Sequence, residues 1–590
     1  MNEKITFRTL WHFILEKKPS LIWGQLITLL AILISIPIPL MLPILVDEVL
    51  LNKPALFVNT IINLFGEGTA FYYIAIIAIT VIFLRFIHFL FSALITKIFT
   101  SISKYVTFKI RKKLISHLQK VCMNEYESLG SGAIGANLVT DVNTLDNFII
   151  TGASRFISSV LMLIAIAMVM IIIHPLLGIM ILLIQPLVML LSKKIARSVS
   201  HLKANENQAI EDFQNNFGET LELFGQIKAS NKEEQFFNEA TSKAKVIQTT
   251  SNEYSYKSVA YERFSFTIFL MSFEVLRASG LLMVVYSDLS IGMMFAMFGY
   301  IWFMMTPVQD ILSMQYSYAT AKAAMARINK ILDLKLEKNG TSVLKPNGLG
   351  VDIKINNLFF SYIKDKPLLE SISLEIKARD KVALIGASGS GKTTLAQVIS
   401  GFYTKTSGEI SYNDISIDKI DKRSLRNSIF LVLQMPILFN NTLRFNITMG
   451  SEKVSDDEIF EALKIAQLSD MISNMSEGLN TIVGKHGIRL SGGQRQRLSI
   501  ARMIIANPSI VIFDESTSAL DVHTEANLFN YLKPILKNKT VITIAHRLST
   551  VKNATSIFVL NDGQLVQKGT HNELELEDGH YQEFLKNQLL

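Results

Sequence analysis

Long apolar stretches alternate with long polar ones over the first half of the chain. Six apolar stretches approach or exceed the roughly 20 residues that a helix needs to cross a bilayer, and they lie at 21–46, 71–94, 156–173, 176–191, 264–286 and 291–305. Only His174 and Pro175 separate the third stretch from the fourth, which predicts a tight helical hairpin. A single stretch is also compatible with a buried core helix, but six in series favour membrane-spanning helices.

Two of the polar stretches, about 97–155 and 192–263, are too long for ordinary connections and have the spacing of amphipathic helices. We therefore expect long cytoplasmic extensions of the membrane helices. Apolar density falls between 327 and 350, where Lys345-Pro346-Asn347-Gly348 indicates a loop. We accordingly predict a membrane domain over 1–330, a linker over 331–350 and a second domain over 351–590.

Composition and charge agree with this division. The chain is 49% hydrophobic and 18% charged, and its mean hydropathy is +0.32. Lys and Arg gather before the first apolar stretch and after the second and fourth, which places both termini and the second domain in the cytoplasm, on a chain in the cytoplasmic (inner) membrane. The net charge of +8 follows the same bias, so we expect no nucleic-acid partner. The single cysteine, Cys122, excludes an internal disulfide.

Candidate chemistry begins after the apolar run 382–385. The segment Gly386-Ala387-Ser388-Gly389-Ser390-Gly391-Lys392-Thr393 fits the phosphate-loop pattern G-x-x-x-x-G-K-[ST], and a preceding strand is the context that this pattern requires. Its glycines let backbone N–H groups converge on phosphate oxygens at a helix start. Lys392 adds a charge for the β- and γ-phosphates, and the Thr393 hydroxyl suits Mg²⁺. A glycine-rich turn that binds nothing is the alternative for this loop alone.

A second apolar run, 510–513, ends in two acids. A buried parallel strand would deliver Asp514 and Glu515 to its carboxyl edge. Asp514 suits a second contact to the metal, and Glu515 suits a general base that polarises the attacking water. Acidic turn residues that merely end a strand are the alternative.

These residues, in this order, resemble the nucleotide-binding domain of the ATP-binding cassette (ABC) family, and the resemblance covers about 351–590. Leu490-Ser491-Gly492-Gly493-Gln494 is similar to the family signature, which presents serine and glycine amides to a nucleotide held by the other subunit. Tyr362 matches the aromatic that stacks on adenine, and Gln434 matches the glutamine that touches Mg²⁺ and water and senses the membrane domain. Taken singly, each has a structural alternative, such as a strand aromatic, a solvated loop residue or a helix-entry turn.

Two further motifs complete the resemblance. Ser518-Ala519-Leu520-Asp521 matches the loop that crosses the dimer interface, and His546 matches the histidine that holds the γ-phosphate and the water beside Glu515. The implied catalytic residues are Glu515 and His546, and the implied Mg²⁺ ligands are Thr393, Gln434 and Asp514. The implied nucleotide contacts are Tyr362, Gly386, Ala387, Ser388, Gly389, Ser390, Gly391, Lys392, Thr393, Thr394, Gln434, Ser491, Gly492, Gly493, Gln494 and Asp521.

The membrane half resembles that of ABC exporters, in which six spans carry long cytoplasmic extensions. The predicted fold class is therefore an all-α polytopic membrane domain followed by an α/β P-loop NTPase cassette domain, as in a bacterial half-transporter of the multidrug, lipid and peptide exporter group. The resemblance implies ATP and Mg²⁺, a second copy of the chain, and export or flipping of an amphiphilic substrate by alternating access. A heterodimer and a nucleotide-gated channel or regulator without coupled transport are the alternatives. A soluble ABC ATPase acting on ribosomes or DNA would lack the apolar stretches.

The resemblance also implies where the two halves couple. In exporters each cytoplasmic extension ends in a short coupling helix that docks on a cassette, and the matching segments are about 126–138 and 217–229. Without the resemblance, both would be ordinary surface helices. Lys485 stands where these exporters usually carry an acidic residue close to the intracellular loops, so the detail of coupling is open at this position.

Charged and polarizable groups inside the apolar stretches are the candidates for substrate contact. Arg85 and His88 lie in the second stretch, and Glu274 and Arg277 lie three residues apart in the fifth. A charge at mid-membrane costs about 2.5–3.5 kcal/mol on insertion scales, so these groups should face protein or a watery cavity, either to pair with each other or to touch substrate. The sixth stretch is rich in methionine, which suits either a pliable cavity or lipid-facing filler.

Overall fold

The chain forms two compact units in the computed structural model, which describes residues 4–53, 55–344, 350–363, 366–484, 487–488, 490–515, 520–545 and 547–589. The first unit comprises Met1–Ser116 and Gly132–Asp333, and the second comprises His117–Ser131 and Leu334–Leu590. The predicted domain limits remain predictions. The predicted loop at 345–348 lies outside the described residues.

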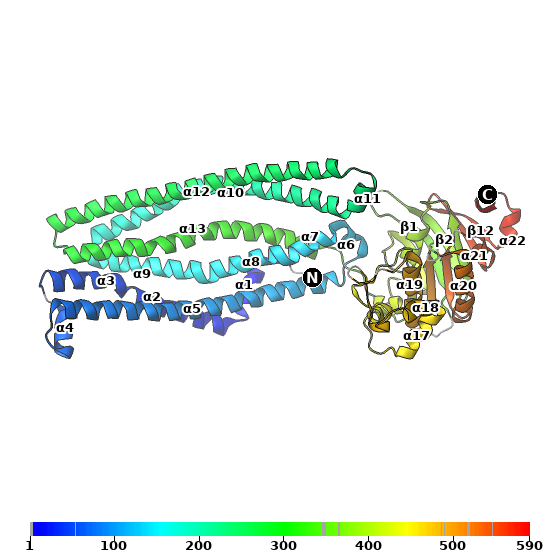
Figure 1. The fold of residues 1–590 in the computed structure, drawn as a ribbon, viewed down its shortest axis with the longest axis horizontal. Coiled ribbons are helices and arrows are strands. Elements are labelled where there is room, and N and C mark those ends of the chain that lie inside the picture. Colours follow the sequence, from blue (N-terminus) through cyan, green and yellow to red (C-terminus); the bar gives the residue numbers. More distant parts are fainter. Residues whose placement is uncertain are drawn as a thin grey trace. The chain divides into compact units, whose positions relative to one another are not determined.

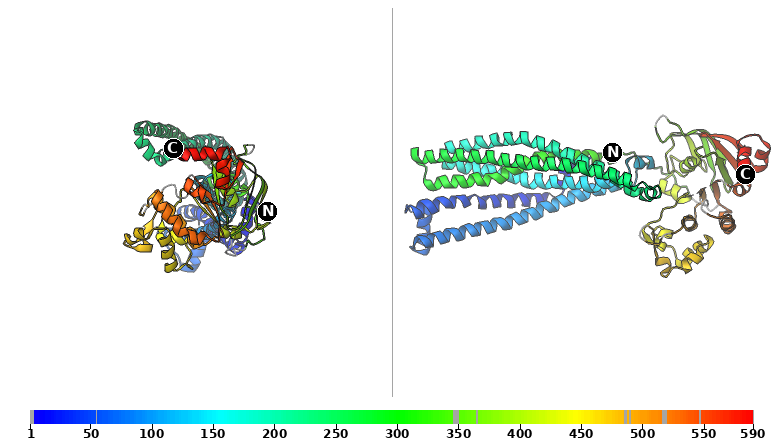
Figure 2. Two further views of the ribbon diagram at one scale, coloured as in Figure 1. Left: turned by 90° about the vertical axis from the view of Figure 1, so that its right-hand side faces the viewer. Right: turned by 45° about the horizontal axis from the view of Figure 1, so that its top comes forward.

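The first unit is helical, and its long helices run side by side (Figures 1 and 2). Its elements are α1 (Phe7–Leu15), α2 (Lys18–Ser35), α3 (Pro37–Pro43), the π-helix η1 (Ile44–Leu50), α4 (Leu56–Phe65), α5 (Ala70–Leu118), α7 (Ser131–Ala136), the π-helix η2 (Asn137–Asp141), α8 (Val142–Ile150), the π-helix η3 (Thr151–Phe156), α9 (Ile157–Ile173), α10 (Pro175–Glu222), α11 (Phe224–Ala229), α12 (Glu233–Tyr286) and α13 (Ile291–Asp333).

Every apolar stretch predicted to cross the membrane falls on helical backbone. Among the described residues, four helical segments are long and apolar enough to span a bilayer, and a fifth helix is apolar but shorter: they are Lys18–Leu50, Ala70–Leu118, Glu233–Tyr286 and Ile291–Ile311, with Ile157–Ile173 as the shorter one. The chain is thus a multi-pass membrane protein, while a count of six crossings stays a prediction. Met294, Met297 and Met304 are buried within the unit, so these three methionines are core residues instead of lipid-facing ones.

The hairpin and the long helical extensions are present, and the short helices have boundaries that differ from those predicted. His174 alone separates α9 from α10, and Pro175 begins α10, where its missing N–H costs no hydrogen bond. The helices α10 and α12 extend over 48 and 54 residues and pack against each other. The segment predicted at 217–229 divides, because α10 continues to Glu222 before α11 begins. The segment predicted at 126–138 divides at Gly130, whose φ of 77° ends a short helix.

Helix α13 is fastened by polar contacts at three levels. At its start, the Asp47 carboxylate accepts hydrogen bonds from the Ser290 hydroxyl at 2.5 Å and the Gly292 N–H at 3.0 Å. Further along, the Ser159 hydroxyl donates to the Asp310 carboxylate at 2.9 Å. Near its end, Arg327 forms a salt bridge with the buried Asp141, and 2.5 Å separates Arg327 Nη2 from Asp141 Oδ1. These contacts fix the rotation of α13 against η1, α9 and η2.

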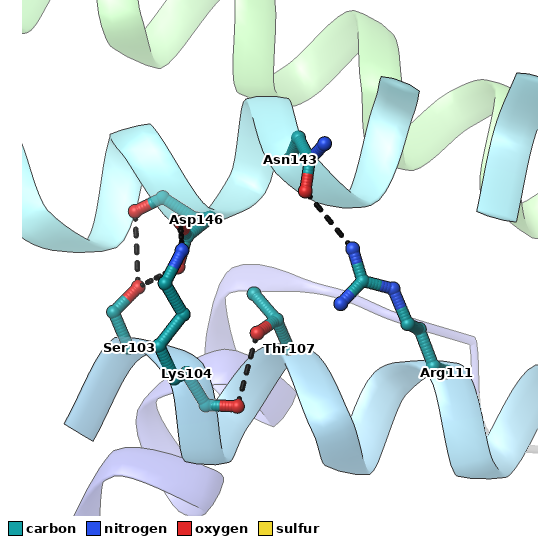
Figure 3. A network of polar contacts seen from close by, with 6 residues as sticks. All are labelled: Ser103, Lys104, Thr107, Arg111, Asn143 and Asp146. Atoms are coloured by element: carbon teal, nitrogen blue, oxygen red, sulfur yellow. Dashed lines mark hydrogen bonds and ion pairs between the residues drawn. The ribbon is translucent and has the colours of Figure 1, made fainter. Parts of the chain in front are cut away.

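A polar network also joins α5 to α8 (Figure 3). The buried Asp146 on α8 pairs with Lys104 and accepts a hydrogen bond from the Ser103 hydroxyl at 2.5 Å. Two turns further along α5, Arg111 donates to the Asn143 side chain at 2.9 Å. Two of the basic residues that follow the second apolar stretch therefore hold helices together.

The second unit is an α/β domain. Its strands are β1 (Ile353–Phe360), β2 (Leu369–Ile376), β3 (Lys381–Gly386), β4 (Ser407–Tyr412), β5 (Ile415–Ser416), β6 (Ile429–Val432), β7 (Asn441–Thr442), β8 (Ile482–Val483), β9 (Ile510–Asp514), β10 (Thr540–Ile544), β11 (Ser556–Asn561) and β12 (Gln564–Gly569). Its helices are α6 (Met123–Leu129), α14 (Lys392–Ile399), α15 (Lys422–Ser428), α16 (Leu443–Thr448), α17 (Asp456–Ile465), α18 (Ser469–Ser473), the 3₁₀ turn η4 (Gly478–Asn480), α19 (Gly492–Ala506), α20 (Val522–Leu536), α21 (Leu548–Lys552), α22 (His571–Leu576) and α23 (His580–Leu589).

The sheets decide where the strand ends lie. One six-stranded sheet has the order β12-β11-β3-β10-β9-β6, in which all neighbours pair in parallel except β11 and β12. The runs β3, β9 and β10 are buried along nearly their whole length, as strands covered on both faces are. A second, antiparallel sheet has the order β2-β1-β4-β5, and its inner residues share a hydrophobic core with the first sheet.

The segment His117–Ser131 belongs to the second unit, although it precedes that unit in the chain by some two hundred residues. Val121 and Leu336 form an antiparallel bridge, with hydrogen bonds from Cys122 N–H to the Lys335 carbonyl and from Glu337 N–H to the Lys120 carbonyl. In the following helix α6, Glu127 accepts a hydrogen bond from the Tyr403 hydroxyl at 2.8 Å. The middle of the polar stretch at 97–155 thus belongs to the α/β domain, to which these contacts fasten it.

Candidate functional site

Four loops meet at one edge of the six-stranded sheet because four neighbouring strands run parallel. The strands β3, β10, β9 and β6 end, respectively, at the phosphate loop, before His546, at Asp514 and shortly before Gln434. Carboxyl ends of parallel strands lie at the same edge, which is where ligands bind in α/β sheets. The topology thus gathers strand ends that are far apart in the sequence, such as Gly386 at the end of β3 and Ile544 at the end of β10.

The phosphate loop has the backbone that its glycines permit. Gly386 has φ 145°, and a Cβ at this position would lie 2.0 Å from the Leu560 carbonyl oxygen. Gly391 is left-handed at φ 95° and precedes the first residue of α14. No other residue type fits both conformations without strain. The loop therefore delivers its N–H groups to the N-terminus of a buried helix, the geometry suited to an anion.

The polar side chains of this loop fit a phosphate group. Ser390 is 3% exposed, and no described residue shares a hydrogen bond with its hydroxyl, so a ligand oxygen would satisfy it. The Lys392 ammonium donates to the carbonyls of Gly386 and Ala387 at 2.9 and 2.8 Å. Its side chain therefore folds back over the loop that would surround a phosphate group. Burial lowers the pKa of Lys392, while the charges of Glu515 and Asp514 oppose that shift.

Two oxygens suited to a metal lie beside this loop. The Thr393 hydroxyl is 3.0 Å from the carboxylate of the buried Asp514. Mg²⁺ takes oxygen ligands and usually binds through one or two protein groups plus substrate phosphates. The described residues contain no cluster of three or more His, Cys, Asp or Glu side chains that would hold a metal without substrate. The oxygens of Thr393 and Asp514 therefore fit Mg²⁺ bound together with a nucleotide.

The proposed base has a strained backbone and an amide partner. Glu515 has φ 45°, the left-handed region that a side chain other than glycine or asparagine seldom adopts, and such strain clusters at functional sites. The Gln434 amide donates a hydrogen bond to Glu515 Oε2. The structure therefore brings these two residues together.

The adenine-stacking candidate lies on the same side of the domain. Tyr362, which follows β1, is 45% exposed, and its hydroxyl is 3.2 Å from the hydroxyl of Thr394 on α14. Its ring meets the rings of Phe360 and Tyr403 edge-on, with centroids 4.8 and 5.2 Å apart. These rings hold an exposed aromatic face next to the helix of the phosphate loop.

The signature segment is placed differently from the rest of the site. Ser491 caps α19, and its hydroxyl accepts from Gln494 N–H while the Gln494 side chain accepts from Ser491 N–H. Ser491 and Gly492 are exposed at the start of this helix. Asp521 caps α20 and accepts from the Thr524 N–H at 2.9 Å, a bond that lowers its pKa.

Three of the residues singled out in the sequence fall outside the described part of the chain. They are His546, Lys485 and Ser518, the last together with its neighbour Ala519. Arg547, next to His546, is described: it pairs with the buried Glu525 of α20 and donates to the Leu520 carbonyl at 2.9 Å. This contact fastens the loop after β10 to the segment that leads into α20.

Sequence analysis missed one buried polar residue close to the site. Gln496 on α19 is 3% exposed and donates to the Gln434 carbonyl at 3.0 Å. The signal was available in principle, because an amide two residues before a run of mostly apolar buried positions needs a partner. Its partner lies 62 residues away in the sequence and is identified by the packing of α19 on β6.

The charged candidates of the membrane unit do not form one site in the described structure. Glu274 and Arg277 make a local ion pair on α12 at 2.5 Å, and both are half exposed. His88 Nδ1 lies 3.2 Å from the carbonyl of Ala31 on α2, and Arg85 is exposed on α5. Asp310 was not among the charged residues predicted within the apolar stretches, because the predicted sixth stretch ended at 305. The apolar segment of α13 continues to Ile311.

Comparisons with known proteins match both units. The model for the ABC transporter transmembrane region matches residues 26–308, and the ABC transporter model matches residues 369–518. The structure is similar to that of a bacterial Atm1-family ABC exporter solved with ATP bound. The alignment includes 97% of this chain and 98% of that chain, with a TM-score of 0.83 and 24% sequence identity. The likeness to this structure shows the exporter fold.

Curated relatives are similar along most of their length. YgaD of Bacillus subtilis (strain 168), provisionally assigned as a multidrug export ATP-binding/permease protein, is 31% identical over 487 residues, 81% of this chain and 82% of the relative. The ATP-dependent lipid A-core flippase of Legionella pneumophila (strain Paris) is 30% identical over 508 residues, 83% of each. The lactococcin-G-processing and transport protein LagD of Lactococcus lactis is 35% identical over 66% of this chain and 56% of its own. A phosphate loop, its acids and a membrane region occur here in one polypeptide, and the chain belongs to the ABC transporter family as an ATP-driven exporter that fuses its transmembrane region to its ATPase domain.

Proposed function

We propose that two copies of this chain form a homodimer in the cytoplasmic membrane. Both termini and the ATPase domain lie in the cytoplasm. The dimer exports or flips an amphiphilic cargo by alternating access. The observation that carries the proposal is that one chain has two nucleotide-contact surfaces of different kinds. The phosphate loop and its acids form a closed cluster at a sheet edge, whereas Ser491 and Gly492 are exposed at the start of α19. A twofold axis would set each surface against its complement on the other copy.

The membrane unit supports a second copy as well. The apolar segment of α5 is only 6% buried and that of α12 only 12% buried within one chain, as lipid-facing or partner-facing helices are. Bulky side chains on these helices are exposed, among them Phe83, Phe86, Met271 and Leu282. We assign part of this surface to the dimer contact, because Arg85 and the Glu274–Arg277 pair lie on the same two helices.

At the ATP site, each side chain has one role in the proposal. The Lys392 ammonium exchanges its two loop carbonyls for the β- and γ-phosphate oxygens, and the Ser390 hydroxyl gains a partner. Mg²⁺, held by Thr393, Asp514 and Gln434, neutralises phosphate charge when bound. Glu515 takes the proton of the attacking water, and His546 and the partner's signature position the γ-phosphate. Tyr362 stacks on adenine, and Asp521 lies at the dimer interface.

The proposed class of cargo follows from the chemistry that the relatives' named substrates have in common. The relatives carry names that refer to multidrug export, lipid A-core flipping and lactococcin G transport, and an amphiphile is what these have in common. Arg85, His88, Glu274, Arg277 and Asp310 are the proposed polar contacts, and exposed apolar side chains on the same helices would hold the apolar part of the cargo.

Coupling to the membrane unit is proposed through α6 and α11. Helix α6 is already fastened to the ATPase domain by the Glu127–Tyr403 hydrogen bond, and Met123 packs on the core of that domain. Helix α11 exposes Phe224, an apolar anchor suited to a partner's surface. ATP acts as a ligand that favours the closed dimer, so closure is driven by its differential affinity.

The test is the ATPase activity of the purified protein in nanodiscs, measured against panels of lipids, peptides and amphiphilic drugs. We expect at least one panel to stimulate turnover, and the Glu515→Gln variant to bind ATP without hydrolysing it. Ligand-dependent conductance in planar bilayers, without stimulation by any panel, would replace the exporter with a nucleotide-gated channel. A native mass equal to one chain would contradict the homodimer.

A further inference from the structure

The buried amide of Gln496 connects two parts of the ATPase domain that serve different nucleotides. Gln496 lies in the second turn of α19, five residues after Ser491, and it moves with the start of that helix because α19 is one continuous element. Its Nε2 donates to the backbone carbonyl of Gln434 at 3.0 Å. The contact is partly buried, because Gln496 is buried and Gln434 is exposed, and removal of the amide takes this donor from the Gln434 carbonyl.

The next bond leads to the base. The side chain of the same Gln434 donates to Glu515 Oε2. Two hydrogen bonds through one intermediate residue therefore run from the signature helix to the carboxylate that acts on water. Glu515 has a left-handed backbone at φ 45°, so its side-chain direction depends on the contacts that hold it.

The bond to Gln434 also affects what Glu515 is able to do. The Gln434 amide occupies an acceptor position on Glu515 Oε2, so a water molecule must compete with this amide for that oxygen. A displacement of α19 that carries the Gln434 carbonyl would change the position of the Gln434 amide, and with it the exposure of Glu515 Oε2.

We infer that Gln496 is a positioning residue through which the nucleotide held by the partner's phosphate loop controls Glu515 of this chain. The inference rests on the proposed homodimer, in which Ser491 and Gly492 of one chain face the nucleotide of the other. Binding at that second site shifts the start of α19, Gln496 carries the shift to Gln434, and Glu515 becomes available to the water at this chain's own site. Such coupling makes turnover at one site depend on occupancy of the other.

The experiment uses Gln496→Met, which keeps the length of the side chain and removes its N–H donors. Mixed dimers are purified through two different tags, with Glu515→Gln in one chain so that a single site turns over. In the cis arrangement Gln496→Met lies in the chain with the intact Glu515, and in the trans arrangement it lies in the inactive chain. Turnover should fall about tenfold in cis, a part of the 10²- to 10⁴-fold effect of a positioned base, and stay within twofold in trans.

The two arrangements separate a relay from simple damage. A disturbed signature helix would impair the active site in trans, because that helix contacts the active site's nucleotide from the inactive chain. Equal loss in both arrangements, loss only in trans, or no loss in either would each overturn the inference. ATP affinity, measured with a fluorescent analogue, should be unchanged in both arrangements, and a tenfold loss of affinity in cis would also overturn it. The same exchange at Gln564, an exposed position on β12, is the matched control. Native mass spectrometry of the wild-type protein tests the homodimer separately.

Discussion

The two units use polar groups in different ways. In the ATPase domain, Lys392, Thr393, Asp514, Glu515 and Gln434 contact one another or their own loop at hydrogen-bond distance, at one sheet edge. In the membrane unit the polar groups lie on separate helices, and most of them fasten one helix to another. The contrast indicates that one chain supplies most of the side chains for the chemistry of the ATPase domain. In the membrane unit, the polar groups of one chain do not form a single site.

The strongest test of a self-contained ATPase cluster is removal of its base. Glu515→Gln should lower ATP turnover at least about 100-fold, because an amide accepts no proton from water, while ATP binding is retained. Steady-state phosphate release and equilibrium nucleotide binding are the measurements. Glu461→Gln, on the exposed face of α17, is the control. Turnover within threefold of wild type would show that another group acts as the base.

The comparison also predicts that the membrane unit depends on its interhelical pairs for stability. Asp141→Asn removes the carboxylate charge that pairs with Arg327, so the salt bridge between η2 and α13 is lost. Because Asp141 is buried, we expect a local loss of about 2 kcal/mol. Hydrogen exchange over 137–141 and the facing turns of α13 should accelerate accordingly, with Asp288→Asn, an exposed loop variant, unchanged. Unaltered exchange would mean that apolar packing alone holds α13.

The network between α5 and α8 should be weaker, because Lys104 is 61% exposed. Lys104→Met leaves the Ser103 hydroxyl on Asp146, so the expected loss is about 0.5–1 kcal/mol. The measurement is exchange over α8, and the control is Lys112→Met, an exposed lysine on the same helix. A loss of about 2 kcal/mol or more would show that the pair is a buried anchor like Asp141–Arg327.

If the charged residues of the membrane unit contact substrate, their substitution should have a selective and modest effect on ATPase activity. Arg85→Gln should change cargo-stimulated ATPase activity about threefold at unchanged basal activity, because Arg85 is exposed on α5. Glu274→Gln should act less on stimulation, since Glu274 already pairs with Arg277. Transport unchanged in both variants would leave these groups a structural role only, as pairs within or between chains.

The smallest expected effect is a pH dependence in the ATPase domain. Lys381, at the start of β3, donates to the carbonyls of Leu536 and Lys539 at the end of α20, and burial lowers its pKa to about 8. Between pH 8 and its ordinary pKa, the folded domain releases a proton that the unfolded chain keeps, so the free energy of unfolding should rise with pH in this window. Denaturant unfolding of Lys381→Met should lack that rise. An identical pH profile in both proteins would refute the prediction.

Local sequence determined most of the ATPase chemistry and the identity of the apolar helices. A phosphate loop needs particular residues at fixed spacing, because backbone N–H groups and one ammonium must meet one phosphate, and Gly386 and Gly391 show the conformations that the pattern requires. The predicted Glu274–Arg277 pair is confirmed, since residues three apart on a helix are neighbours whatever the fold. The hairpin at His174 follows from the same short-range logic.

Tertiary structure decided what long-range packing brings together. Nothing local in Gln496 points to Gln434, and nothing local in Asp141 points to Arg327, because each partner lies on another element whose position depends on the whole unit. The parallel order β3-β10-β9-β6 likewise sets which strand ends are neighbours, and packing assigns His117–Ser131 to the ATPase domain. Sequence alone specified the groups that do the chemistry. The fold specified which of them touch, because contact between distant residues is a property of the packed chain.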